Sequence, residues 1–295
     1  MSELVFVAAL PLIISSAYYW LLNVDTGRAL YPDSHRYFAA GGGERLHKPF
    51  HLRWLLPFVC RQSPRLWKWV TGGAMVLLPV MMSVYLYEQG VEPKKCLVGA
   101  CLLLGLPGII RMNALAEYLL DGTALLFMLT SATCFLAGNV PLGIAFSCLG
   151  GMTKESTPIF AALACWNPLA LLGFVPVIAA ALIRKPNPVD MLGGEVILSH
   201  PFQTGIQFHR GRWFSLEFML LPFGVCILGL MHLSVPLIVM IVVSYAQLLV
   251  ATDSVRLYQW CFPLLILATV QVLPLEYSAI AIVMHWLNPY QKYYI

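Results

Sequence analysis

Residues 122–153 read GTALLFMLTSATCFLAGNVPLGIAFSCLGGMT, a run of 32 residues without a charged side chain. A membrane-spanning helix needs about 20 apolar residues to cross a bilayer core about 30 Å thick, so the run is too long for a single crossing. The tetrapeptide GNVP at 138–141 is a turn signal, because Gly, Asn and Pro favour turn geometries. The stretch therefore predicts two helices that meet at 138–141, the second of them short.

The whole chain shares this apolar character. Of its 295 residues, 59% are hydrophobic and 11% are charged, whereas soluble domains carry about 25% charged residues. This composition excludes a soluble globular enzyme and a disordered chain. The net charge of +4 is too small for a nucleic-acid-binding protein with a basic stripe, so no nucleic-acid partner is expected. We expect a polytopic helical membrane protein embedded in a lipid bilayer.

Further uncharged stretches predict the other membrane spans. They cover 4–24, 69–87, 96–110, 156–183, 218–252, 257–275 and 277–288. Turn signals divide two of them, WNP at 166–168 and HLSVP at 232–236. The fold class predicted is all-α, a transmembrane helical bundle of nine to eleven spans in one integral membrane domain over 1–295. The charges concentrate in 24–69 and 184–217, which are the predicted aqueous loops.

Acidic and basic side chains follow the first span closely. The segment YPDSHRYF at 31–38 contains Asp33 and Arg36, and Glu44 and Arg53 come shortly after it. A carboxylate beside arginines at a membrane surface suits acid–base chemistry on an anionic lipid. The same residues also fit a solvated amphipathic helix with Tyr and Trp at the interface.

Two acids stand at the entrance of the next apolar run. Glu117 and Asp121 are four residues apart, which places them on one face of a helix. Like charges at this spacing repel each other, so a cation or hydrogen-bond donors are expected nearby. Acids that favour the N-terminal end of a helix dipole are the structural alternative.

Isolated charges interrupt two other apolar regions. Lys154 and Glu155 lie between 122–153 and 156–183, and an ionisable residue at membrane depth is a functional-site hypothesis by default. Asp253 and Arg256 are the only charges between Glu217 and Glu276. Asp253 fits a helix N-cap. Arg256 fits either snorkelling to the interface or bidentate binding of a phosphate.

In their order, these segments resemble the GT-C superfamily of integral membrane glycosyltransferases, which take a sugar from a polyprenyl-phosphate carrier. The resemblance rests on PDSHRY at 32–37, FHLRWLLP at 50–57, TKE at 153–155 and DSVRL…FP at 253–263. Many members carry two adjacent acids in the first loop, whereas here Asp33 is followed by serine. The chain is also shorter than most members and has no appended soluble domain.

The resemblance implies an inverting transfer of a sugar to an acceptor hydroxyl, at the non-cytoplasmic face of the cell membrane. The acceptor class, whether lipid, glycan or protein, stays open. The implied roles are Asp33 as catalytic base with Glu44 as a second acid, Lys154, Arg256, Arg36 and Arg53 as donor-phosphate ligands, and Glu117, Asp121 and Glu155 as acceptor ligands or ligands of a divalent cation such as Mg or Mn. Eight Lys and Arg residues in 24–69 oppose this sidedness, because the positive-inside rule places such a loop in the cytoplasm.

Two other functions remain open at this stage. A transporter or lipid flippase places its polar residues near the bilayer midplane on broken helices, often in repeats. Here the charges lie at predicted helix ends and no repeat is visible, which favours the enzyme. A structural membrane protein without chemistry is the third alternative. The enzyme requires Asp33, Lys154 and Arg256 on one membrane face, and span counting allows this only if 156–183 breaks at 166–168.

Overall fold

The computed structural model of the protein describes residues 3–25, 32–46, 50–116, 118–187, 201–211, 215–249, 251 and 255–289. Every regular element in these ranges is a helix, with short 3₁₀ or π segments labelled η. The elements are η1 Val5–Ala9, α1 Leu10–Asp25, α2 Pro32–Gly41, η2 Phe50–Leu52, α3 Leu55–Cys60, α4 Pro64–Glu88, α5 Pro93–Leu104, η3 Pro107–Arg111, α6 Met112–Leu115, α7 Asp121–Leu136, α8 Val140–Thr153, α9 Thr157–Cys165, η4 Pro168–Gly173, α10 Phe174–Ile183, α12 Pro201–His209, α13 Leu216–Met219, η5 Leu221–Met231, α14 Val235–Ala246, η6 Gln247–Leu249, α15 Val255–Tyr258, η7 Gln259–Cys261, α16 Phe262–Val272, η8 Leu275–Tyr277 and α17 Ser278–Trp286.

The helices begin where the sequence supplies a cap and a proline. Ser63, Asn139 and Ser234 precede α4, α8 and α14, and each side chain accepts a hydrogen bond from the backbone N–H three residues on. A proline follows at the first or second helical position in all three. Proline is favoured there because it has no N–H to leave unpaired and its φ is already helical.

The predicted breaks are confirmed. The turn at 138–141 separates α7 from α8, with Gly138 at φ 76°. Trp166 adopts a left-handed conformation that ends α9 before η4 begins, so 156–183 forms two segments divided at 166–168. The HLSVP break at 232–236 likewise separates η5 from α14.

The stretch 96–110 differs from the prediction of one straight span. Two helical segments, Pro93–Leu104 and Pro107–Ala114, are bent by 66° at a short break. Pro107 at the break has no N–H to continue the hydrogen-bond ladder, which is the ordinary cause of such a kink.

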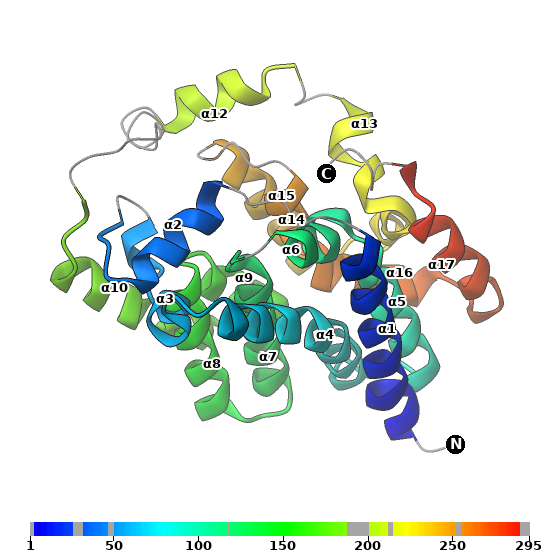
Figure 1. Ribbon diagram of the computed structural model, residues 1–295. Coiled ribbons are helices and arrows are strands. Elements are labelled where there is room, and N and C mark those ends of the chain that lie inside the picture. The colour runs from blue at the N-terminus through cyan, green and yellow to red at the C-terminus, as the bar shows by residue number, and fades with distance from the viewer. Residues whose placement is uncertain are drawn as a thin grey trace.

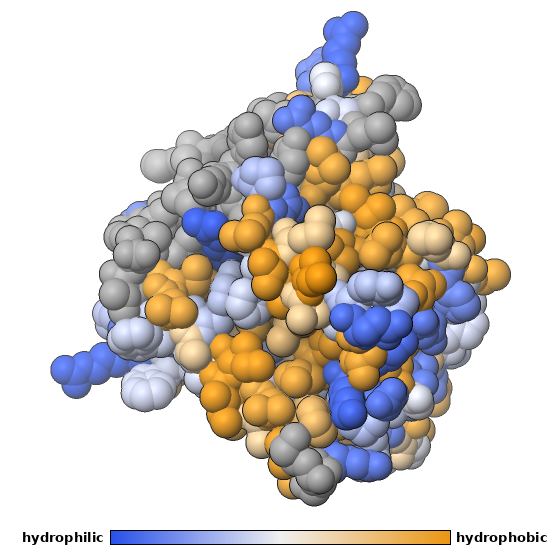
Figure 2. Space-filling view, turned by 90° about the vertical axis from the view of Figure 1, so that its right-hand side faces the viewer, coloured by the Kyte–Doolittle hydropathy of each residue, from blue (hydrophilic) through white to orange (hydrophobic). Residues whose placement is uncertain are grey.

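The described helices are apolar, and several are long enough to span a membrane. Val5–Leu22, Pro64–Glu88 and Val255–Val272 qualify by length and composition, and the bent pair makes a fourth candidate. Five further apolar helices have only 10–17 residues. The prediction of nine to eleven spans counted these shorter helices as well. By length and composition, the described residues contain only three or four helices that could each cross a membrane. One face of the molecule in Figure 2 exposes many hydrophobic residues, as expected of a protein embedded in lipid.

The long helix α4 crosses the middle of the bundle in Figure 1 and packs against α1, α5 and α7. The short helices α2, α3 and α10 lie together at one side of the view, while α13, α16 and α17 lie at the other. The hairpin of α7 and α8 leads into α9, whose residue Phe160 packs edge-on against Trp260. The charged segments between these helices are thereby brought toward the centre of the bundle.

Gly108 of the bent pair lies close against the backbone at the start of α15. A Cβ at this position would lie 2.7 Å from the carbonyl oxygen of Val255. We expect Gly108→Ala to lower the free energy of unfolding by about 1–3 kcal/mol, because neither backbone can yield easily. Gly73, which lies in the middle of α4 with nothing within 4 Å of its would-be Cβ, is the control.

Gly73→Ala should instead stabilise the protein by about 0.5–1 kcal/mol, since alanine is the better helix former. Thermal unfolding in one detergent measures both variants. Equal behaviour of the two would contradict close packing at Gly108.

Candidate functional site

Asp121 is the shared partner of two cations from distant parts of the chain. It is the first residue of α7, and its carboxylate accepts a hydrogen bond from the Lys154 ammonium through Oδ1. Its other oxygen, Oδ2, forms an ion pair with Nη1 of Arg256 at 3.1 Å. The start of α7, the junction of α8 with α9, and α15 therefore meet at one carboxylate.

This cluster is buried. Asp121 is 4% exposed, and Lys154 and Arg256 are each 6% exposed. The Lys154 ammonium also lies 4.8 Å from the centroid of the Trp260 ring, which adds a cation–π contact. Because burial removes the ions from water, each cation depends on the Asp121 carboxylate for compensation.

A second ion pair adjoins the first. Nε and Nη2 of Arg53 donate to the two carboxylate oxygens of Glu155 at 2.7 and 2.6 Å, and Nη1 donates to the Tyr37 hydroxyl at 2.7 Å. Since Glu155 follows Lys154 directly, the three ion pairs join into one cluster whose described members are three cations and two carboxylates.

The pKa values at this junction reflect competing effects. Burial lowers the pKa of Lys154 below its ordinary value, and the Asp121 carboxylate acts against that shift. Burial would raise the pKa of Glu155, but the Arg53 guanidinium outweighs it and holds that pKa below its usual range. Glu155 is therefore an ionised partner of Arg53 at neutral pH.

Two amide side chains hold the backbone around the cluster. Oδ1 of Asn113 accepts from the Gly122 N–H at 3.1 Å, and its Nδ2 donates to the Ile109 carbonyl at 2.8 Å. Gln259 accepts from the Gly108 N–H at 2.9 Å. Asn113 ties the bent pair to α7, where Gly122 follows Asp121. Gln259 ties the bent pair to the segment directly after α15, three residues after Arg256.

Apart from Glu117, the other site residues predicted from the sequence lie near α2 and the segment that follows it. The guanidinium carbons of Arg36 and Arg53 lie 4.6 and 4.9 Å from the centroid of the Phe50 ring, so these two cations are brought together. Glu44 is exposed and lines a cavity beside Arg53. Asp33 lies in the first turn of α2, one turn before Tyr37. The side chain of Asp33, and Glu117 altogether, lie outside the described residues.

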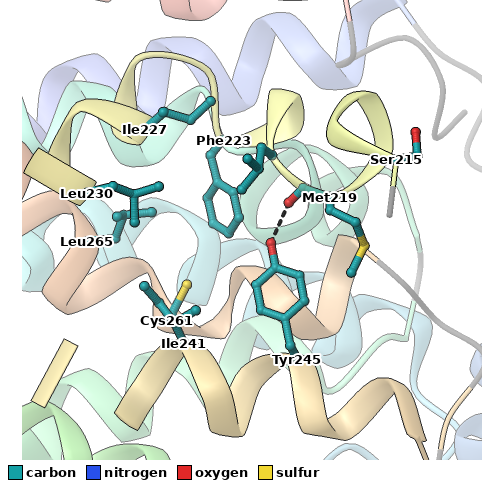
Figure 3. A pocket seen from close by; sticks show the side chains of 10 residues that line it. Ser215, Met219, Phe223, Ile227, Leu230, Ile241, Tyr245, Cys261 and Leu265 are labelled. Carbon is teal, nitrogen blue, oxygen red and sulfur yellow. Dashed lines mark hydrogen bonds between the residues drawn. The ribbon is translucent and has the colours of Figure 1, made fainter. Parts of the chain in front are cut away.

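The cavity beside Arg53 has a volume of about 700 Å³ and a strongly basic wall. Its charged lining residues are Arg45, Arg53, Arg61, Arg184, Lys185 and Glu44. A second cavity of about 460 Å³ lies between η5, α14 and α16 and is lined mainly by apolar side chains, among them Phe223, Leu230 and Leu265 (Figure 3). In that view the Tyr245 hydroxyl donates to the Met219 carbonyl at one end of the cavity.

Sequence reasoning did not nominate Tyr37 or Trp260 as site residues. Both lie in the segments that carried the nominated charges, four residues after Asp33 and Arg256. On a helix this spacing puts two residues on one face. An aromatic residue four positions after a predicted site charge is therefore the sequence signal that could have identified Tyr37 and Trp260. Among the described residues, no three His, Cys, Asp or Glu side chains group in a way that could hold a metal ion.

No family model matches the sequence, and no curated protein and no solved structure matches it either. The class of the protein therefore rests on its own features. Over the residues that the structure describes, it is all-helical, with three or four helices that could span a membrane and a buried ionic cluster at the ends of shorter helices.

The shared carboxylate predicts an order of stabilities. Asp121→Asn removes the carboxylate that two buried cations share and should lower the free energy of unfolding by about 3–5 kcal/mol. Lys154→Met should lose clearly less, because the pair of Asp121 and Arg256 stays balanced. Glu88→Gln, at an exposed carboxylate, is the control and should be nearly silent. Chemical unfolding in one detergent gives the three values, and equal losses for Asp121→Asn and Lys154→Met would contradict a shared carboxylate.

Proposed function

We propose that the protein is an inverting membrane glycosyltransferase that moves a sugar from a polyprenyl-phosphate carrier to an acceptor hydroxyl. One observation carries the proposal: Lys154 and Arg256, which stand 102 positions apart, meet on Asp121, so that two cations are held together in the interior. The order of motifs that resembles the GT-C superfamily supports it further.

Two cations held in fixed positions suit the leaving group of this reaction. When the bond between the anomeric carbon and the phosphate oxygen breaks, that oxygen gains negative charge. Cations held in place before the reaction stabilise such charge without reorganising. Asp121 and Glu155 hold Lys154 and Arg53 in this way. In this proposal Asp121 positions the cations, which replaces the role of acceptor or divalent-cation ligand suggested by sequence.

A carboxylate is needed on the acceptor side. Asp33, near the start of α2, is proposed to take the proton from the acceptor hydroxyl while its oxygen attacks the anomeric carbon. The sugar is transferred with inversion, polyprenyl phosphate leaves, and no covalent intermediate forms. The position of α2 supports this role, because the Tyr37 hydroxyl of the same helix accepts a hydrogen bond from Arg53 of the cluster.

The apolar cavity of about 460 Å³ suits the isoprenoid chain of the carrier. Cys261, one of its lining residues, follows Trp260 directly, and Trp260 is the ring beneath Lys154. Tyr245, another lining residue, stacks on Tyr258 with centroids 5.1 Å apart. A chain in this cavity therefore lies beside the elements that carry Lys154 and Arg256.

The direct test is to incubate the purified protein with a panel of polyprenyl-phosphate sugars and measure released polyprenyl phosphate. Release that requires an added acceptor supports transfer. No release from any donor, with a protein that is folded by thermal unfolding, would overturn the proposal.

A transporter or lipid flippase is the second candidate, and one observation favours it. The bent pair of α5 with η3 and α6 lies beside the buried cluster, and transporters build their binding sites on broken helices. Movement of a labelled polyprenyl-phosphate sugar across proteoliposomes, without its cleavage, would support this candidate over the enzyme.

Asp33→Asn should abolish transfer, because the amide has the shape of the carboxylate but cannot accept the proton. Its thermal unfolding should stay near that of the wild type. Glu44→Gln is the matched variant, as Glu44 is the other acid nominated near α2. Substantial turnover in Asp33→Asn together with its loss in Glu44→Gln would move the base to Glu44.

Arg256→Lys should lower turnover roughly 100-fold, a typical effect of losing one preorganised donor to developing charge. Lysine keeps the charge for Asp121 but not the planar fork that fits a phosphate. Arg65→Lys, at an exposed arginine of α4, controls for arginine loss as such. Wild-type turnover in Arg256→Lys would leave Arg256 as an ion-pair partner only.

A further inference from the structure

The cationic cavity adjoins the buried cluster at Arg53, but its outer wall is not explained by that cluster. Its outer wall comprises Arg45 and Arg61 on one side and Arg184 and Lys185, just after α10, on the other. All four are exposed, whereas Lys154 and Arg256 are buried. Among the described residues that line the cavity, Glu44 is the one carboxylate against five Lys and Arg side chains, so an anion is favoured there.

Two local features of the cavity wall, one in the backbone and one in a side chain, cost folding free energy. Arg61 has φ 48° and ψ −141°, a backbone conformation that residues other than glycine rarely adopt and that clusters at ligand-binding sites. It is held there by Trp67, whose indole N–H donates to the Arg61 carbonyl at 2.8 Å. Trp54 also lines the cavity, and its buried indole N–H has no partner in the described part of the chain.

The two sides of the cavity are joined into one built structure. The Asn187 N–H donates to the Leu46 carbonyl at 2.9 Å, which ties the segment after α10 to the loop after α2. The Arg184 guanidinium lies 5.7 Å from the centroid of the Trp54 ring. Cations from segments more than 100 residues apart in the sequence are thereby directed at the same space.

The rim of the cavity is apolar and exposed. Phe58 and Ile183 line the cavity and are 66% and 78% exposed, respectively. Exposed apolar side chains beside a ring of cations suit an amphiphile, with its anionic group among the cations and its chains over Phe58 and Ile183. A small water-soluble anion would use the cations but not this rim.

We propose that this cavity binds the phosphate headgroup of an anionic lipid. Arginine and lysine side chains form charge-assisted hydrogen bonds to phosphate oxygens, and basic pockets between membrane helices are suited to such headgroups. The Trp54 indole N–H supplies a further donor. Four of its cations, Arg45, Arg61, Arg184 and Lys185, are not assigned to the sugar donor, whereas Arg53 borders both sites. The proposal stands whether or not the protein transfers a sugar.

The test measures binding of phosphatidic acid to the full chain in detergent by native mass spectrometry, with phosphatidylcholine as the comparison lipid. Arg184→Gln/Lys185→Gln removes two exposed wall cations and should weaken phosphatidic acid binding about tenfold or more. Arg65→Gln/Lys68→Gln removes the same charge from exposed positions of α4 outside the cavity, and it should bind as the wild type does. Arg61→Gln is a second wall variant, in case the first one does not fold.

Each outcome decides the proposal. Weaker binding in the wall variants alone supports it, and unchanged binding in Arg256→Lys shows that the site is distinct from the proposed donor site. Equal losses in the wall and α4 variants would mean diffuse surface charge and overturn it. Equal binding of phosphatidylcholine, or displacement of the lipid by inorganic phosphate at the same concentration, would overturn the assignment to a lipid headgroup.

Discussion

The carboxylate of Asp121 is the constraint around which the middle of the molecule is organised. Two cations approach it from α15 and from the junction of α8 with α9, and all three groups are buried. A buried ion pair adds little net stability compared with apolar packing, but an unpaired buried charge is strongly destabilising. A fold in which only some of the three segments meet would leave a buried charge unpaired. The cluster therefore favours the arrangement in which all three come together.

The irregular helices make this arrangement possible. Charged residues at the middle of long straight spans would lie in hydrocarbon, whereas breaks place them at helix ends inside the bundle. The breaks also free backbone groups, which must find partners within a membrane protein. Gln259 and Asn113 provide such partners at the bent pair and at the start of α7. Structural irregularity and the position of the charges are thus linked.

Two cavities of opposite character flank the cluster. The one beside Arg53 is basic, and the one beside Cys261 is apolar. Molecules that combine a phosphate with a long hydrocarbon chain match both kinds of surface. The proposed sugar donor and the proposed anionic lipid belong to this chemical class.

The sequence by itself determined the class of the fold and most of its breaks. Uncharged runs of about 20 residues predict apolar helices, and the signals at 138–141, 166–168 and 232–236 mark their ends, because caps, prolines and turn residues act locally. Isolated charges such as Lys154 and Arg256 could likewise be recognised from their apolar surroundings. The tertiary structure alone decided which charges meet. It paired Asp121 with Lys154 and Arg256. The prediction that Glu117 and Asp121 share one helix face is wrong, because α6 ends at Leu115 and α7 begins at Asp121. Spacing along the chain reports only local geometry, whereas long-range ion pairs depend on how the helices pack.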